Sequence, residues 1–212
     1  ERGGGGARGR VLCTGGAPLA PVVLGVDPDL NGALAVVDAP LWDPEAQVLR
    51  AAAPRLYDLP TFTEQVGKLQ RRRHDPERVA AILAELELPA GSSAFLEKPR
   101  NFPTDGKHSW YGSGFGFGVW WAALASAGVR VQVVPPAQWK RDVGLYGKQF
   151  TKDDSRARAA ELYPDAEAML RRKKDHGRAE ALLLAAWGCG YRRPLAAAAP
   201  AEGGAEEEAV AG

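Results

Sequence analysis

Cysteines and long apolar runs are both scarce in this 212-residue chain. Two cysteines, Cys13 and Cys189, cannot build the disulfide framework of a small secreted domain, so a reducing compartment is expected. No apolar run approaches the roughly 20 residues of a membrane-spanning helix, and we expect no membrane partner. The length suits one α/β domain with a sizeable core and is too short for two comfortable ones.

The chain also carries almost no net charge, with a formal value of +1 at pH 7, but its charges are unevenly distributed. The stretch from Lys140 to Arg178 holds eleven Lys or Arg against seven Asp or Glu. Such a local excess of base suits a face that binds a polyanion. A solvated helix surface would explain the same counts equally well.

Low-complexity stretches flank a central body. Residues 1–20 are rich in Gly, Arg and Ala, and residues 195–212 are rich in Ala, Gly and Glu. Neither stretch can bury much apolar surface, so we interpret them as a flexible arm and a low-complexity tail. The folded domain is predicted to span 21–194. Because the chain begins at Glu1 rather than Met, we expect that an upstream segment has been removed.

Strand and helix signals alternate along this body. Apolar runs predict strands at 22–26, 33–37, 93–97 and 129–134, with one more between 47 and 58. Capping residues and helical spacing predict helices at 75–87, 117–127, 151–162 and 175–187. This order predicts an α/β fold with a mixed central sheet flanked by helices.

Two carboxylates, Asp27 and Glu97, stand at the ends of predicted buried strands. If those strands are neighbours, both side chains project from one edge of the sheet, where they repel each other and raise each other's pKa. A divalent cation would remove this repulsion, and carboxylate oxygens suit Mg²⁺ or Mn²⁺. Each acid could instead cap a turn or pair with a base such as Lys98, and the spacing alone leaves that alternative open.

A third acidic position lies in the last predicted helix. Glu180 stands among Ala and Leu residues, and His176 shares its face because the two are one turn apart. Asp175 lies roughly 140° around the helix from Glu180, so it can join the same site only from the first turn or just before it. Capping the helix is the other role open to Asp175, as a surface salt bridge is for Glu180.

Four motifs, taken in order, resemble the RuvC-type Holliday junction resolvases. They are Leu24-Gly25-Val26-Asp27-Pro28 followed by Gly32, Phe95-Leu96-Glu97, Pro135-Pro136-Ala137-Gln138-Trp139-Lys140, and Glu180-Ala181-Leu182. Each motif alone is weak, but together they cover residues 22–188. The chain looks most similar to the plant chloroplast members of the family. The resemblance implies a ribonuclease H-like fold and a location in the chloroplast stroma and nucleoid.

The same resemblance implies a Mg²⁺-dependent endonuclease, with Mn²⁺ able to substitute, that cuts four-way DNA junctions symmetrically by two-metal hydrolysis. Its role would be plastid DNA recombination and nucleoid segregation. The family's metal ligands fall on Asp27, Glu97 and Glu180. Its remaining acid falls on Gly177, which cannot ligate, so we expect Asp175 as the fourth ligand and His176 as its competitor. The predicted catalytic residues are therefore Asp27, Glu97, Asp175, His176 and Glu180.

The family places phosphate-binding lysines after the strand at 129–134, where Lys140 and Lys152 are the nearest matches. An aromatic residue beyond the catalytic Glu falls on Phe102, which could stack on bases or pack within its loop. The predicted DNA-binding residues are Lys98, Arg100, Phe102, Lys107, Lys140, Lys148, Lys152, Lys173 and Lys174. The helix at 117–127 corresponds to the family's dimer contact, so a two-fold homodimer on a four-way junction is expected.

Two other functions stay open. A non-catalytic nucleic-acid-binding relative is compatible with glycine at position 177. A ribonuclease H-like enzyme that acts on RNA or DNA–RNA hybrids is compatible with the same carboxylates. Cutting of a junction, of a hybrid, or of neither separates these functions.

Overall fold

A mixed sheet forms the centre of the computed structural model, which describes residues 22–38, 40–43, 45, 48–50, 53–100 and 102–193. Its strands are β1 Val22–Val26, β2 Ala33–Asp38, β5 Arg55–Asp58, β8 Ser93–Glu97 and β9 Arg130–Val134. They lie in the order β5–β2–β1–β8–β9. β1 is antiparallel to β2 and parallel to β8, which is in turn parallel to β9. The predicted mixed α/β sheet is confirmed.

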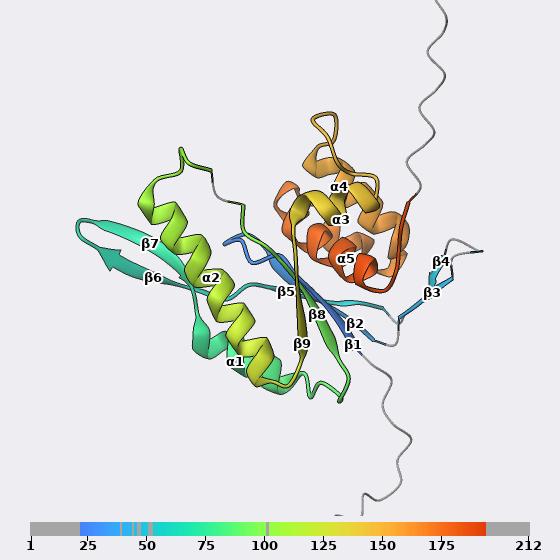
Figure 1. Cartoon of the computed structure of the whole chain (residues 1–212), viewed down its shortest axis with the longest axis horizontal. Coiled ribbons are helices and arrows are strands. Elements are labelled where there is room, and N and C mark those ends of the chain that lie inside the picture. Colours follow the sequence, from blue (N-terminus) through green and yellow to red (C-terminus); the bar gives the residue numbers. More distant parts are fainter. Residues whose placement is uncertain are drawn as a thin grey trace, which may run out of the picture.

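Helices cover both faces of this sheet. They are α1 Pro76–Glu85, α2 Lys107–Ser126, α3 Pro136–Asp142, α4 Lys152–Leu162 and α5 His176–Gly188, with the 3₁₀ segments η1 Pro164–Leu170 and η2 Lys173–Asp175. Figure 1 shows α1 and α2 on one face and α3, α4 and α5 on the other. Each layer closes its own core, around Trp120 of α2 and around Trp139 of α3. β1 and β2 are therefore buried on both faces.

α5 lies closest to the sheet. Every residue from Ala181 to Trp187 is buried. At Gly25 in β1, a Cβ atom would collide with the carbonyl oxygen of Ala181, so only glycine lets the strand and the helix come so close. This contact holds the first half of α5 beside the end of β1.

Two ribbons lie outside the central sheet. β3 Leu41–Asp43 pairs with β4 Val48–Arg50, and β6 Thr61–Val66 pairs with β7 Leu69–His74. The β6–β7 hairpin projects from the body beside α2 (Figure 1). The sequence did not predict this hairpin, because polar and charged residues occupy both of its faces and leave no apolar alternation to recognise. The strand expected between 47 and 58 divides into β4 and β5, and only β5 joins the central sheet.

α2 begins ten residues before the predicted start at residue 117. Glycines 112, 114, 116 and 118 lower the helix propensity of this stretch, which is why the pattern did not predict a helix there. Packing overrides propensity: a Cβ at Gly116 would collide with the His74 imidazole, so the glycine lets α2 approach β7. α3 was also missed. Its Pro136 occupies the first turn, where proline is tolerated, whereas the sequence pattern indicated only the end of a strand.

The predicted arm at 1–20 and tail at 195–212 lie outside the described residues, so the domain boundaries stay predictions. Within the described ranges, no helix combines the length and the apolar character needed to cross a bilayer.

Candidate active site

Three carboxylates lie near the edge where β1 and β8 end. Asp27 directly follows β1, and Glu97 is the last residue of β8. These strands are parallel neighbours, with Val26 opposite Leu96, so their ends lie side by side as expected. Glu180, in the second turn of α5, reaches the same edge because α5 packs directly on β1.

Asp27 is buried among other acids. Its side chain is 5% exposed and accepts a hydrogen bond from the backbone N–H of Asp29 at 3.2 Å. Burial raises the pKa of Asp27 well above its usual range. Neighbouring negative charges raise that pKa further, in the order Asp29, Glu97 and Glu180. A cation that joins the cluster would offset both effects and favour the ionised form of Asp27.

Glu97 is held by two residues of α3. The indole Nε1 of Trp139 donates a hydrogen bond to Glu97 Oε2 at 2.7 Å. Burial raises the pKa of Glu97 to about 7, although the charge of Lys140 and the Trp139 hydrogen bond both oppose the shift. Lys140 itself donates to Glu180 Oε1 at 2.8 Å. Burial alone would lower the pKa of Lys140, but the adjacent carboxylates raise it overall, so Lys140 stays charged.

Asp175 faces a different set of partners. Its carboxylate accepts hydrogen bonds from the backbone N–H and the guanidinium of Arg172, both at 2.8 Å, and lies 4.0 Å from Arg178. Arg178 in turn makes a two-pronged contact with Asp58 at the end of β5, at 2.7 Å for both pairs of atoms. Asp175 occupies the residue before α5, but its side chain makes no capping hydrogen bond there. The structure thus engages Asp175 with arginines and does not bring it to the three carboxylates.

His176, the first residue of α5, contacts two lysines instead of the arginines that surround Asp175. Its Nε2 lies 3.0 Å from the Nζ of Lys152, and its Nδ1 lies 3.3 Å from the Lys173 carbonyl oxygen. The two contacts together favour the tautomer in which Nδ1 carries the proton and Nε2 accepts from the lysine. His176 stands one turn before Glu180 on the same helix face. The lone pair on His176 Nε2 therefore accepts a hydrogen bond from Lys152, and it would become available to a metal ion if that bond broke.

Gly177 has a packing role. It forms an isolated bridge with Gly32 in the turn after Asp27. A Cβ at Gly177 would collide with the Asn31 carbonyl oxygen and stand 2.7 Å from the Gly32 Cα, and a Cβ at Gly32 would collide with the Asp27 carbonyl oxygen. No acidic side chain fits at this position in this backbone. The departure from the bacterial pattern thus coincides with a direct contact between α5 and the turn that carries Asp27.

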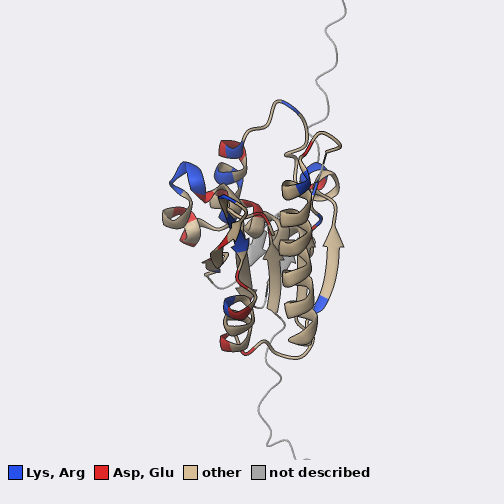
Figure 2. Ribbon diagram, turned by 90° about the vertical axis from the view of Figure 1, so that its left-hand side faces the viewer, with Lys and Arg blue, Asp and Glu red and all other residues tan. Residues whose placement is uncertain are grey.

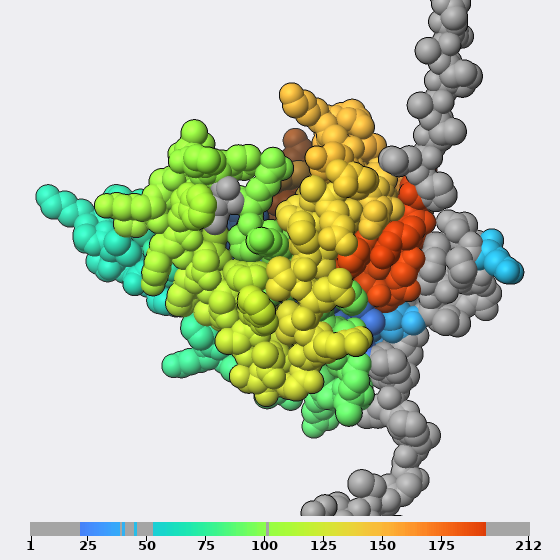
Figure 3. Space-filling model, in the orientation of Figure 1, coloured from blue at the N-terminus to red at the C-terminus, as the bar shows by residue number. Residues whose placement is uncertain are grey.

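A cleft of about 680 Å³ opens beside Glu97 and Glu180. On the face shown in Figure 3, the surface is hollowed between the green segment that precedes α2 and the yellow and orange segments of α3 and α4. The basic residues that line the cleft are Arg100, Lys140, Lys148 and Lys152. Four of the nine predicted DNA-binding residues therefore share one concavity with two of the predicted metal ligands.

The other predicted DNA-binding residues lie around this cleft or away from it. Phe102 is 46% exposed, and the Arg100 guanidinium lies 4.6 Å from the centre of its ring. Lys107 opens α2. Lys98 pairs through its backbone with Val134 of β9. Lys173 and Lys174 belong to η2, on the Arg172 and Asp175 side of α5.

Asp29 and Trp139 are site residues to which the sequence analysis assigned no role. Asp29 adds a negative charge to Asp27, and Trp139 positions Glu97. Trp139 lies inside a motif quoted above, immediately before Lys140, and Asp29 lies two residues after Asp27, between Pro28 and Gly32 of the first motif. Their position in the sequence was a usable signal, but only the fold shows which carboxylate each one contacts.

The donor set fits a hard divalent cation. Clustered carboxylates whose pKa values are raised by burial and by one another gain most from such an ion, and oxygen ligands suit Mg²⁺ or Mn²⁺. As the side chains stand within the described ranges, no three Asp, Glu, His or Cys groups are close enough to enclose a metal. Lys140 pairs with Glu180 and is close enough to Glu97 and Asp27 for their charges to raise its pKa, so an ion would have to compete with its ammonium.

Comparison with known proteins finds similarity to Holliday junction resolvases. No protein-family model matches the chain. Over 106 residues, half of its length, it is 42% identical to the chloroplastic Holliday junction resolvase MOC1 of Chlamydomonas reinhardtii, of which it spans only 12%. Thermus thermophilus RuvC, solved in complex with a Holliday junction substrate, matches 82% of this chain and 99% of RuvC, with a TM-score of 0.50 and 20% identity.

A second Thermus thermophilus RuvC structure covers the same shares, with a TM-score of 0.47 and 17% identity. The sequence similarity covers half of the chain, and the structural similarity extends over most of it. The chain is therefore similar in sequence to a chloroplastic Holliday junction resolvase and has the fold of RuvC, which confirms the RuvC-type resemblance and the ribonuclease H-like fold expected from its motifs.

Proposed function

We propose that this chain is a Mg²⁺-dependent endonuclease that resolves four-way DNA junctions by cutting two opposed strands. The observation that carries the proposal is that Glu97 and Glu180 line a basic cleft and lie close enough to Asp27 for their charges to raise its pKa. The similarity to MOC1 supports the activity, and the structure of RuvC with a Holliday junction supports the substrate. Mg²⁺, with Mn²⁺ as its substitute, follows from the oxygen donors.

The three carboxylates would hold the metal ions through their oxygen atoms. When bound, the metals would supply an activated water and stabilise the leaving oxygen of a phosphodiester. For the fourth ligand, His176 needs only to release Lys152, whereas Asp175 would have to leave the two Arg172 contacts. We therefore rank His176 above Asp175, which reverses the order expected from the sequence.

The chain's own cations would position the DNA strand. Lys140 contacts Glu180, and Lys152 contacts His176, which stands one turn before Glu180 on α5. Each can transfer its hydrogen bond to a backbone phosphate when a metal takes its present partner. Arg100 and Lys148 line the outer part of the same cleft and would bind flanking phosphates.

Phe102 is the candidate for contact with the bases. Its exposed ring stands beside the cleft, under the Arg100 guanidinium, and its carbonyl oxygen accepts a hydrogen bond from Trp110 Nε1 at 3.2 Å. An aromatic ring held in this way can stack on a base that is unpaired at the centre of a junction. The basic residue above it keeps the ring near the phosphate backbone. Phe102 would thus contribute to selection of branched DNA over duplex DNA.

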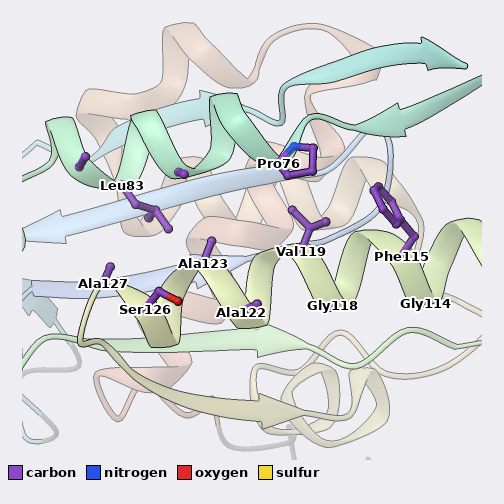
Figure 4. A pocket seen from close by; sticks show the side chains of 12 residues that line it. Pro76, Leu83, Gly114, Phe115, Gly118, Val119, Ala122, Ala123, Ser126 and Ala127 are labelled. Carbon is purple, nitrogen blue, oxygen red and sulfur yellow. The ribbon is translucent and has the colours of Figure 1, made fainter.

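The outer face of α2 is the candidate dimer contact. After Lys107 the helix has no charged residue, and Figure 2 shows it free of Lys, Arg, Asp and Glu below its first turn. An apolar groove of about 740 Å³ lies between α1 and α2. Figure 4 shows Phe115 and Val119 of α2 at this groove, with Gly114 and Gly118 leaving room for a close approach. A second copy fits, because a four-way junction needs two opposed active sites.

Sedimentation of a Val119→Glu variant tests this contact. Val119 is half-buried at the groove and packs against the rim of the core around Trp120, so a charge there opposes association, and a circular dichroism melt checks that the variant stays folded. The wild type is expected to sediment as a dimer and Val119→Glu as a folded monomer. A matched change on the opposite layer, Glu161→Lys on exposed α4, should leave the dimer intact. A monomeric wild type, or a dimeric Val119→Glu, would reject α2 as the interface.

We infer a chloroplast location, in the stroma and its nucleoids, from the similarity to chloroplastic MOC1. Plastid DNA recombination and nucleoid segregation are the roles that junction cutting would serve there. Expression of the full protein with a fluorescent tag tests this assignment. A signal over plastid DNA supports it, and a signal confined to the nucleus or cytosol rejects it.

A substrate panel tests the proposed activity. The protein is incubated with Mg²⁺ and labelled four-way junction, linear duplex or DNA–RNA hybrid of the same sequence. We expect cutting of the junction alone, at matching positions on two opposed strands. Cutting of the hybrid would instead identify a ribonuclease H-like activity, and junction binding without cutting a non-catalytic relative.

A further inference from the structure

We propose a second phosphate-binding concavity, formed by β7 and the first turns of α2, in which Arg71 contacts the backbone of the DNA strand on the far side of the carboxylates. This inference rests on the proposed function and extends its binding site. The concavity measures about 550 Å³. Its lining comes from the turn after Asp27, from β7, from α2, and from Lys152 and His176 at the starts of α4 and α5.

The lining is strongly basic. It includes Arg71, Arg72, Arg73 and Lys152, against one acidic residue, Asp29. All three histidines of the chain, His74, His108 and His176, also line it. Serines 109 and 113 add hydroxyl groups. A polar hollow with this balance of charge is suited to a phosphate, and its single acid, Asp29, belongs to the carboxylate cluster itself.

Two of the three arginines already have structural partners. Arg72 donates to the Leu30 carbonyl oxygen at 2.9 Å and so braces the turn after Asp27. Arg73 is 6% exposed, forms an ion pair with Glu64 at 3.0 Å and stacks over Tyr111. These contacts fix β7 against the catalytic turn and α2. They also leave these two guanidinium groups poorly placed to take a further ligand.

Arg71 differs from both neighbours. It is half-buried, and its Nε atom is shielded from solvent without a hydrogen-bond partner among the described residues. A buried donor without a partner is costly, and a ligand that accepts from it removes that cost. A phosphate is the acceptor that a guanidinium fits best. Among the three arginines that line this concavity, Arg71 is therefore the one available for a ligand.

The concavity adjoins the catalytic cleft at Lys152, which lines both. One hollow contains Glu97 and Glu180, and the other contains Asp29. An extended strand that passes over the carboxylates would therefore place phosphates in both hollows, at Lys140 on one side and at Arg71 on the other. Holding the strand on both sides of the scissile bond would keep it aligned with the metal ligands.

Binding measurements on Arg71→Gln test the proposal. The background is Asp27→Asn, which prevents cutting while Mg²⁺ is present. Affinity for a labelled four-way junction is measured by fluorescence anisotropy at several salt concentrations. Arg130→Gln is the matched control, because Arg130 is exposed and pairs with Ser93 at the opposite end of the sheet from Glu97. Arg71→Lys restores a point charge at the same position.

We expect Arg71→Gln to weaken binding about tenfold and to reduce the slope of log affinity against log salt by about 1, the value for one lost phosphate contact. Arg71→Lys should recover the slope, and Arg130→Gln should leave slope and affinity unchanged. An Arg71→Gln slope equal to that of the parent, or no recovery in Arg71→Lys, overturns the proposal. A parent that does not bind the junction at all overturns the proposed function instead, so the two failures are distinguishable.

Discussion

The ammonium of Lys140 lies 2.8 Å from Glu180 Oε1, in a pair that joins α3 to α5 across the candidate active site. Both side chains are largely shielded, Lys140 at 27% and Glu180 at 14% exposed. The charge of Lys140 also lowers the pKa of Glu97 against the effect of burial. Lys140 is thus an internal counter-ion to the carboxylate cluster as well as a candidate phosphate ligand.

Replacement of Lys140 by Gln should move the pH dependence of cutting. Because the charge of Lys140 opposes the rise in the pKa of Glu97, its loss should raise that pKa above about 7. The pH at half-maximal cleavage rate is then expected to rise, and Lys140→Arg should keep it near the wild-type value. A pH–rate profile checks this, with Lys148→Gln as the control from the same cleft. An unchanged midpoint in Lys140→Gln would show that the pair does not tune Glu97.

Metal affinity should depend on pH in the neutral range. Protons and cations compete for the carboxylates, and burial places the pKa of Glu97 at about 7. A drop from pH 8 to pH 6 crosses that pKa, so the fraction of ionised Glu97 falls about tenfold and Mg²⁺ affinity should fall by a similar factor. Calorimetric titration with Mn²⁺ or Mg²⁺ measures this change. Glu97→Gln should bind more weakly and lose the part of the pH dependence that Glu97 contributes, whereas equal wild-type affinity at both pH values would contradict the assignment.

Gly177 should tolerate no side chain. A Cβ atom there would collide with the Asn31 carbonyl oxygen, so Gly177→Ala must separate α5 from the turn that carries Asp27. We expect a loss of about 1–3 kcal/mol in the free energy of unfolding, together with slower cutting. Gly177→Asp, which recreates the acid of the bacterial pattern, should be at least as damaging. Thermal and denaturant unfolding measure the effect, and a Gly177→Asp variant that cuts faster than the wild type would refute the packing role.

Asp175 and His176 should separate into different roles. Asp175→Asn weakens the contacts to Arg172 and Arg178, so stability should fall while Mg²⁺ affinity changes little. His176→Ala removes a half-buried side chain from the face that carries Glu180, so metal affinity and cutting should fall while the unfolding temperature stays within a few degrees. Paired titrations and melting curves decide between them. The opposite pattern would restore Asp175 as the fourth ligand.

The sequence predicted the parts of this fold that have a regular apolar pattern or a strong cap. Asp75 accepts a hydrogen bond from Arg78 N at the start of α1, and Thr151 forms a capping box at the start of α4, as their positions indicated. The β6–β7 hairpin and the first half of α2 have neither signal. They form because Gly116 fits against His74 and because Arg73 bridges Glu64 and Tyr111, contacts that depend on the tertiary structure.

The candidate site divides in the same way. The positions of Asp27 and Glu97 follow from strand ends, and that of Glu180 from the match to the family's final helix acid. The direction of Asp175 does not follow from spacing, because it is set by Arg172 and Arg178 in three dimensions. The packing role of Gly177 likewise could not be predicted, because the residue packs against the turn at Gly32, 145 residues earlier in the chain.

Single-turnover cleavage of a four-way junction by the wild type, Asp27→Asn and Glu97→Gln tests the central claim most directly. The account predicts paired cuts on opposed strands by the wild type in Mg²⁺. It predicts cutting slower by at least about a hundredfold in both variants, with junction binding retained. Cutting by either variant at the wild-type rate, or a wild type that binds the junction and leaves it intact, would contradict it.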